Sequence, residues 1–184
     1  PQKLFELYMM DDGEPNPRQE EELCTRLNEL VPQYDLVFVA DYGHGMLEAE
    51  AVEVLCSRAR FLALNTQVNA GNRGFNTVSK YGRADFICVS ENEIRLEARS
   101  RLKDLREIML EVGSRLSCPR MVVTQGRDGS LSFNEEEGFF EVPAFAVEVV
   151  DRVGAGDAVF SVAALCAIEG APAEVVGFVG NAVG

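Results

Sequence analysis

Short apolar runs alternate with longer amphipathic stretches along the first two thirds of the chain. The runs are rich in Val, Ile, Leu and Phe, as in "DLVFVA", and are typical of strands that a parallel sheet buries on both faces. In the stretches between them, apolar residues recur three and four positions apart, as Leu23, Leu27 and Leu30 do, which is the period of a helix. The pattern predicts strands over 35–40, 61–65, 85–90 and 120–124, and helices over 17–31, 47–59 and 102–116.

The rhythm changes after residue 124. Segments 130–133, 138–142 and 144–150 are short, alternate in polarity and are joined by turn residues, which is typical of antiparallel strands. Helices are predicted over 156–169 and from residue 172 onward. This order predicts a three-layer α/β fold, in which helices cover both faces of a mostly parallel sheet with antiparallel strands at its edge.

The length of 184 residues fits a single domain, and no apolar run approaches the ~18 residues of a membrane span. The N-terminal segment lacks the basic and then apolar layout of a secretory signal. The first predicted strand begins only at residue 35, and the last helix ends with an apolar face that has no partner. We therefore expect residues 1–184 to form one partial domain, incomplete at both ends.

The net charge of −13 narrows the classes of partner. So acidic a surface disfavours binding to nucleic acid, because the phosphate backbone is itself anionic and the chain has no basic cluster. A small anionic substrate would need local positive potential from helix N-termini, scattered arginines or a metal ion.

Cysteine and histidine usage adds two limits. The five cysteines are odd in number and form no C-x-x-C pair, which indicates buried, reduced thiols in a cytoplasmic protein. The single histidine, His44, excludes a zinc site with several histidines. Any base catalyst is therefore either His44 or a carboxylate.

The stretch "DRVGAGDAVF" (151–160) carries the strongest candidate chemistry. Glycines at 154 and 156 allow backbone N–H groups to converge at the start of a helix, where the helix dipole favours an anion. Asp157 follows in the first helical turn, where its carboxylate can accept a proton from an attacking hydroxyl. The alternative is an ordinary tight turn in which Asp157 only supplies a favourable charge at a helix N-terminus.

A second glycine motif lies upstream. In "VVTQGRDGS", Thr124, Gly126 and Gly129 have T-x-G-x-x-G spacing directly after a predicted buried strand. Alone, this spacing is also compatible with a simple strand-to-hairpin turn.

Together and in this order, the two motifs resemble those of the ribokinase-like (PfkB) sugar kinases, whose signature D-T-x-G-A-G-D differs from "DRVGAGD" only at Arg152. The resemblance implies a ribokinase-like fold and ATP-dependent phosphorylation of a sugar hydroxyl. It also implies a catalytic base, an anion hole for the transferred γ-phosphoryl group, and part of a nucleotide pocket. These roles fall on Asp157, on Gly154, Ala155 and Gly156, and on Thr124, Gly126 and Gly129, respectively.

The resemblance further implies two cations. Glu93 matches the glutamate of the family's N-x-x-E motif, which acts through Mg²⁺ and its waters, although Ser90 stands where the motif has asparagine. Asp151 matches a position near a monovalent-cation site, such as K⁺, in some members. Arg152 in place of threonine puts that second site in question.

Segment 38–47, "FVADYGHGML", resembles the D-Y-x-K-G-x-L stretch of the heptose-phosphate kinase branch. It implies that Asp41 lies near the substrate and that His44, at about the position of a lysine, is a loop or substrate-contact residue rather than a catalytic one. The amide-rich segment 64–76 occupies the place of a D-P-K motif with a phosphate-directed lysine. There, Asn65 is a candidate hydroxyl contact and Arg73 the nearest cation, while a polar surface loop is an equal alternative.

The sequence leaves three candidate functions. The first is an ATP-dependent kinase for a sugar or sugar phosphate, in a protein that forms a homodimer or carries fused domains. The second is a catalytically silent nucleotide-binding or scaffolding domain, slightly favoured by Arg152 and Ser90. A dinucleotide-binding oxidoreductase is the poorest, because no G-x-G-x-x-G follows an early strand. Because the family's sugar lid precedes the matched region, we expect residues 1–184 alone to phosphorylate poorly or not at all.

Overall fold

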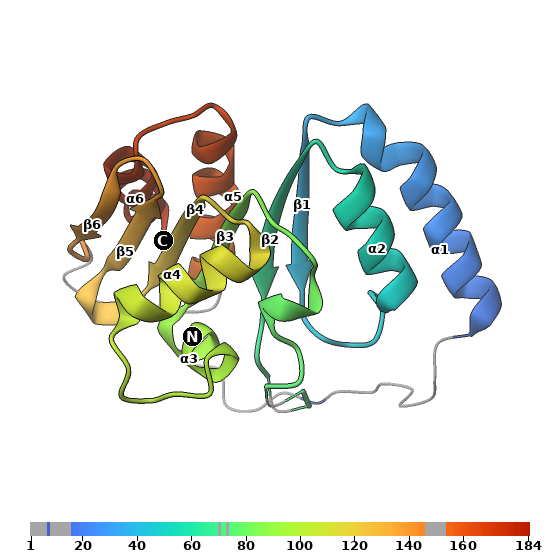
Figure 1. The fold of residues 1–184 in the computed structure, drawn as a ribbon, viewed down its shortest axis with the longest axis horizontal. Helices are drawn as coiled ribbons and strands as arrows, with labels where there is room; N and C mark the ends of the chain where they lie inside the picture. Colours follow the sequence, from blue (N-terminus) through green and yellow to red (C-terminus); the bar gives the residue numbers. More distant parts are fainter. Residues whose placement is uncertain (1–6, 8–15, 70, 73, 146–153) are drawn as a thin grey trace.

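Six strands form one sheet, whose order across the sheet follows the order of the chain. The structure is a computed structural model and describes residues 7, 16–69, 71–72, 74–145 and 154–184. The colour sequence across Figure 1 follows this strand order. The first four strands pair in parallel, and the fifth pairs antiparallel with both the fourth and the sixth. The strands are β1 (Leu36–Asp41), β2 (Phe61–Thr66), β3 (Phe86–Ser90), β4 (Arg120–Thr124), β5 (Ser130–Asn134) and β6 (Gly138–Val142).

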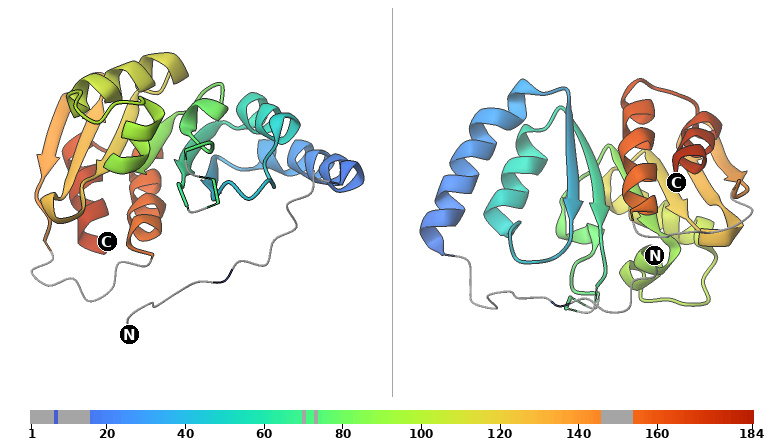
Figure 2. Two further views of the ribbon diagram at one scale, coloured as in Figure 1. Left: turned by 90° about the horizontal axis from the view of Figure 1, so that it is seen from below. Right: turned by 180° about the vertical axis from the view of Figure 1, so that it is seen from behind.

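Helices cover both faces of the sheet (Figure 2). On one face, α2, α3 and α4 pack over alternate strand residues such as Leu64, Ile87 and Val123, and α1 packs against α2. On the other face, α5 and α6 pack over Ala63, Cys88 and the other residues of opposite parity. The helices are α1 (Pro17–Leu30), α2 (Ala49–Arg58), α3 (Glu91–Glu97), α4 (Leu105–Leu116), α5 (Ala155–Ile168) and α6 (Ala173–Val183), with short 3₁₀ turns η1 (Val31–Gln33), η2 (Val78–Lys80) and η3 (Gly126–Asp128). The predicted three-layer α/β fold is confirmed.

The bounds of the main elements agree with the predicted ones to within a few residues, and two predictions need correction. The run 35–40 is not a strand buried on both faces, because β1 lies at the edge of the described sheet and Phe38 is 41% exposed where it stacks on Phe160. The apolar composition of a run does not distinguish an edge strand from a central one. In the predicted strand 144–150, Ala144 and Phe145 belong to no strand, and 146–150 lie outside the described residues.

Two properties of the whole chain were also expected. No helix in the described part of the chain is long and apolar enough to cross a bilayer. All five cysteines are unpaired thiols; Cys88 and Cys118 are buried, and burial raises the pKa of the Cys118 thiol to about 12. Cys24, Cys56 and Cys166 are only half-buried, so the expectation of buried thiols holds for part of the set.

The parallel strands bring their carboxyl ends to one edge of the sheet. There Asp41 lies opposite Thr66, and Ser90 lies opposite Thr124. The helix α5 begins at the same edge, since Asp157 in its first turn contacts the segments that follow β1 and β2. This is the edge at which open α/β sheets bind ligands.

The last helix lies close to the antiparallel strands over a buried polar stripe, Ser130 and Ser132. The side-chain amide of Asn181 donates to Ser130 Oγ at 3.0 Å. A Cβ atom on Gly177 would lie 2.1 Å from Ser132 Oγ and 2.9 Å from a methyl carbon of Val142. Glycine is therefore required at position 177 by the approach of α6 to the sheet.

We predict that Gly177→Ala lowers the free energy of unfolding by about 1–3 kcal/mol, because the added methyl group forces α6 away from β5. Chemical denaturation monitored by circular dichroism measures the change. Gly82→Ala is the matched control, since nothing lies within 4 Å of a Cβ there and its backbone is not left-handed. Equal stability of the two variants would contradict the required close approach.

Candidate active site

The first turn of α5 forms one half of the candidate site. Gly154 caps the helix with φ +83°, a left-handed conformation that favours glycine. Gly154 and Gly156 are exposed, and no atom lies within 4 Å of the Cβ position of either. The first N–H groups of a helix have no intrahelical acceptor, so the amides of this turn are available to an anion beside open space.

The carboxylate of Asp157 is held by two neutral donors from the opposite side. Gln67 Nε2 donates to Oδ1 at 2.9 Å, and the Tyr42 hydroxyl donates to Oδ2 at 3.3 Å. No ion pair joins Asp157 to any residue of the described ranges. Partial burial, followed by the Asp157 charge, raises the pKa of the Tyr42 phenol, so that this group stays a protonated donor. Asp157 is thus half-buried and hydrogen-bonded, and no cation of the described residues pairs with it.

Asp41 lies beneath this contact as a buried anchor. Its side chain is 5% exposed, and its Oδ2 accepts from Lys80 Nζ at 2.9 Å and from the Tyr81 hydroxyl at 2.8 Å. Its Oδ1 accepts from the backbone N–H of Gly43 at 2.9 Å. Burial, followed by the adjacent Asp41 charge, raises the pKa of Tyr81. Both oxygens of the predicted substrate residue are therefore engaged inside the domain.

Asparagine side chains clamp the segments that follow β1 and β2 to each other. Asn72 Nδ2 donates to the carbonyls of Tyr42 and Gln67, each at 2.9 Å. Asn76 Nδ2 donates to the carbonyl of Asp41 at 2.8 Å. Both asparagines are buried, so this part of the amide-rich segment is not the polar surface loop of the alternative interpretation.

The other two described substrate candidates lie on the same two segments. His44 is exposed, and its Nε2 lies 3.2 Å from Asn69 Nδ2. Asn65 is buried at the end of β2, where its amide donates to the carbonyl of Cys88 at 2.7 Å. Its Oδ1 has no hydrogen-bond partner among the described residues, which leaves an acceptor open for another group. Arg73, Asp151 and Arg152 lie outside the described residues.

Glu93 forms a capping box with Ser90 at the start of α3. Its Oε2 accepts from the backbone N–H of Ser90 at 2.7 Å and from the Ser90 hydroxyl at 2.8 Å. Its Oε1 accepts from the backbone N–H of Val68 at 3.2 Å. Serine at position 90 therefore serves as a helix N-cap. Both carboxylate oxygens of Glu93 already accept hydrogen bonds, which is compatible with a metal role through water.

The T-x-G-x-x-G loop lies at the same edge of the sheet. Thr124 ends β4, and Gly126 begins η3 with φ +61°. Gly129 has φ +94°, and a Cβ atom there would lie 2.0 Å from the carbonyl oxygen of Val142. The second glycine of the motif is thus fixed by a close backbone approach, and only glycine can occupy the position.

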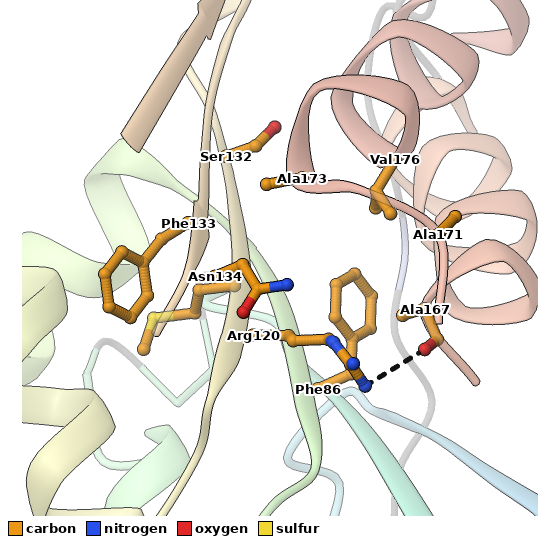
Figure 3. Close-up of a pocket in the computed structure, with 10 residues that line it drawn as sticks. Phe86, Arg120, Ser132, Phe133, Asn134, Ala167, Ala171, Ala173 and Val176 are labelled. Carbon is orange, nitrogen blue, oxygen red and sulfur yellow. Dashed lines mark hydrogen bonds between the residues drawn. The ribbon is translucent and has the colours of Figure 1, made fainter. Parts of the chain in front are cut away.

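One small cavity of the domain lies away from the candidate site. A cavity of about 10 Å³ lies between the sheet and the helices α5 and α6, where Arg120 donates to the carbonyl of Ala167 (Figure 3). It adjoins the amino end of β4 and the carboxyl end of α5, opposite to Asp157, so it is not part of the candidate site.

Within the described ranges, no three His, Cys, Asp or Glu side chains gather to hold a metal ion.

The sequence comparison identifies the family. Residues 9–184 match the family described as pfkB family carbohydrate kinase. The chain belongs to this family. The expected resemblance is therefore confirmed, and the three-layer arrangement of helices and sheet is that of the ribokinase-like fold.

Relatives of this pfkB chain include two proteins called Bifunctional protein HldE. The one from Vibrio vulnificus is 31% identical over 184 residues, which cover 98% of this chain and 37% of that protein. The one from Desulfatibacillum aliphaticivorans is 29% identical over 157 residues, which cover 82% of this chain and 31% of that protein. The chain thus spans about a third of the length of these relatives.

The fold is also similar to that of solved kinases. The tetrameric inhibited form of phosphofructokinase-2 from Escherichia coli superposes with a TM-score of 0.75 at 16% identity, over 95% of this chain and 58% of that chain. The same enzyme in complex with fructose-6-phosphate gives a TM-score of 0.72 at 16% identity, over 95% and 57%. These likenesses establish the fold.

Two hydrogen bonds of the candidate site were not predicted from the sequence. They run from Gln67 and Tyr42 to the carboxylate of Asp157. Gln67 belongs to segment 64–76, which resembles the D-P-K region of the family. Tyr42 belongs to the D-Y-x-K-G-x-L stretch. The motifs identified the two segments, but only the fold shows that both contact Asp157 in α5.

We predict that Asp41→Ala lowers the free energy of unfolding by about 3 kcal/mol, because it leaves Lys80 and Tyr81 without their acceptor. Urea denaturation measures the change. Asp35→Ala is the control, since the Asp35–Arg60 pair is exposed on both sides and should contribute less than about 1 kcal/mol. If the two substitutions cost the same, Asp41 is not an anchor.

Proposed function

We propose that this domain catalyses ATP-dependent transfer of a phosphoryl group to a hydroxyl of a sugar or sugar phosphate, with Asp157 as the general base. The observation that carries the proposal is the position of Asp157 in the first turn of α5, beside exposed amides and without a cationic partner among the described residues. A carboxylate paired with a buried cation would be a weaker proton acceptor. Family membership supports the reaction class.

In the proposed step, the backbone amides of the turn bind the phosphoryl group and the Asp157 side chain accepts the proton. The amides of Gly154, Ala155 and Gly156 hold the γ-phosphoryl oxygens, where the helix dipole stabilises their negative charge. Asp157 accepts the proton of the acceptor hydroxyl while that oxygen attacks phosphorus. The bond from phosphorus to the bridging oxygen of ATP breaks, and ADP leaves with the electron pair.

The nucleotide is proposed to lie along the loop that contains Thr124, Gly126 and Gly129. This loop shares the carboxyl edge of the sheet with Asp157, because Thr124 pairs with Ser90 at the end of β3. Magnesium bound with the nucleotide would neutralise charge on the phosphates. Glu93 would hold it through water, since hydrogen bonds already occupy both Glu93 oxygens. A monovalent cation near Asp151 stays a prediction.

The acceptor is proposed to contact His44 and the open Oδ1 of Asn65, with Arg73 as a candidate for an anionic substituent. Asp41 would act indirectly, because Lys80, Tyr81 and Gly43 already occupy its oxygens. The relatives called HldE and the "DYGHGML" stretch favour the heptose-phosphate kinase branch, and thus a sugar phosphate. The word bifunctional in the relatives' name supports fusion to a further domain, and a phosphofructokinase-2 described as tetrameric supports self-association.

We predict that Asp157→Asn in the full-length protein lowers kcat by about 10²–10⁴-fold and leaves the Kd for ATP nearly unchanged, because it removes the proton acceptor and preserves shape. Release of ADP is measured with Mg-ATP and a panel of sugars and sugar phosphates, and ATP binding by calorimetry.

Glu174→Gln is the matched control for that experiment. Glu174 is an exposed acid in the first turn of α6, so it tests the general effect of removing a charge from a helix N-terminus. Full activity of the Asp157→Asn protein would refute the role of base. ATP binding without sugar-dependent ADP release by the unsubstituted protein would select the silent nucleotide-binding domain instead.

A further inference from the structure

We propose that Gln67 is a positioning residue for the base: its side-chain amide fixes Oδ1 of Asp157 and leaves Oδ2 as the oxygen that takes the hydroxyl proton. The inference rests on the proposed function. Gln67 Nε2 lies 2.9 Å from Oδ1, the normal length for an N–H···O hydrogen bond. The contact links the segment after β2 to α5 across 90 positions of the chain.

The two donors to Asp157 are not equivalent. The Tyr42 hydroxyl lies 3.3 Å from Oδ2, longer than the usual 2.7–2.8 Å of an O–H···O bond, and Tyr42 is 42% exposed. Gln67 is half-buried and makes the shorter contact. An acceptor hydroxyl can therefore replace Tyr42 at Oδ2 more readily than it can replace Gln67 at Oδ1.

The backbone of Gln67 is held from both sides. Its N–H donates to the carbonyl of Asp41 at 2.8 Å, and its own carbonyl accepts from Asn72 Nδ2 at 2.9 Å and Asn76 Nδ2 at 3.4 Å. Asp41 is in turn anchored by Lys80. Because the main chain is fixed in this way, the side-chain amide is presented to Asp157 from a rigid frame.

The side chain of Gln67 donates to Asp157 without carrying a charge. An ammonium group at this place would favour the ionised carboxylate more strongly than an amide does and would weaken it as a proton acceptor. The titratable groups on the described segments around Asp157 are the Tyr42 phenol, His44, Glu93 beside Val68, and Asp41 with its partner Lys80. A neutral amide at position 67 orients Asp157 without placing a further positive charge beside it.

The test compares Gln67→Met, which keeps the length and removes the donor, with Gln67→Lys, which adds a cation. In the full-length protein both should lower kcat by about tenfold or more, with KM for ATP unchanged. The acid limb of the kcat profile should move to higher pH in the Met variant, because the carboxylate loses a donor that favours its charged form. It should move to lower pH in the Lys variant.

A purely structural role predicts an equal loss of rate in both variants with no movement of the acid limb, and that result would overturn the proposal. Gln33→Met is the control, since the Gln33 amide makes only a local bond to the carbonyl of Glu29. The pKa of Asp157, followed by ¹³C NMR of protein labelled at aspartate Cγ and assigned with Asp157→Asn, provides a readout without turnover. Opposite shifts in the Met and Lys variants support the contact even if no acceptor is phosphorylated, in which case only the proposed function fails; unshifted values overturn the inference.

Discussion

The buried carboxylate of Asp41 is the interaction on which the functional edge of the sheet depends. A charge that is 5% exposed is tolerated only with compensation, and here Lys80, Tyr81 and the Gly43 amide supply it. These three donors come from the turn after β1 and from the end of η2, so one side chain connects β1 to the chain after β2. The position of Gln67 follows, since its N–H bonds to the carbonyl of Asp41.

The frame around Asp41 extends through amides rather than through charges. Irregular segments leave backbone carbonyls that must find donors when they are buried, and Asn72 and Asn76 supply those donors. The choice has an electrostatic consequence at the sheet edge. Amides satisfy the carbonyls without placing a cation next to Asp157, while the first turn of α5 supplies the positive potential that an anionic ligand needs in a chain with a net charge of −13.

Much of the fold could be predicted from the sequence, because apolar periodicity reports local structure. The four parallel strands, the hairpin of β5 and β6, and the helices α1, α2, α4, α5 and α6 appear near their predicted bounds. The glycine motifs also located Asp157 and the loop at Gly129. The exposure of Phe38 and the contacts of Asp41 with Lys80 and Tyr81 could not be predicted, since each depends on residues distant in the chain. The Tyr42–Asp157 contact, for example, spans 115 positions.

The helix α5 places its first turn beside the segments that form the rest of the candidate site. It packs against all four parallel strands through residues such as Val159, Phe160 and Ala163, so its first turn is fixed relative to every loop at the carboxyl edge. The segments after β1 and β2 orient Asp157, and the loop after β4 lies on the other side of Ser90 and Glu93. In the proposed function, a donor nucleotide and an acceptor hydroxyl would meet at the first turn of α5, which accounts for the adjacency of the glycines and the aspartate in the sequence.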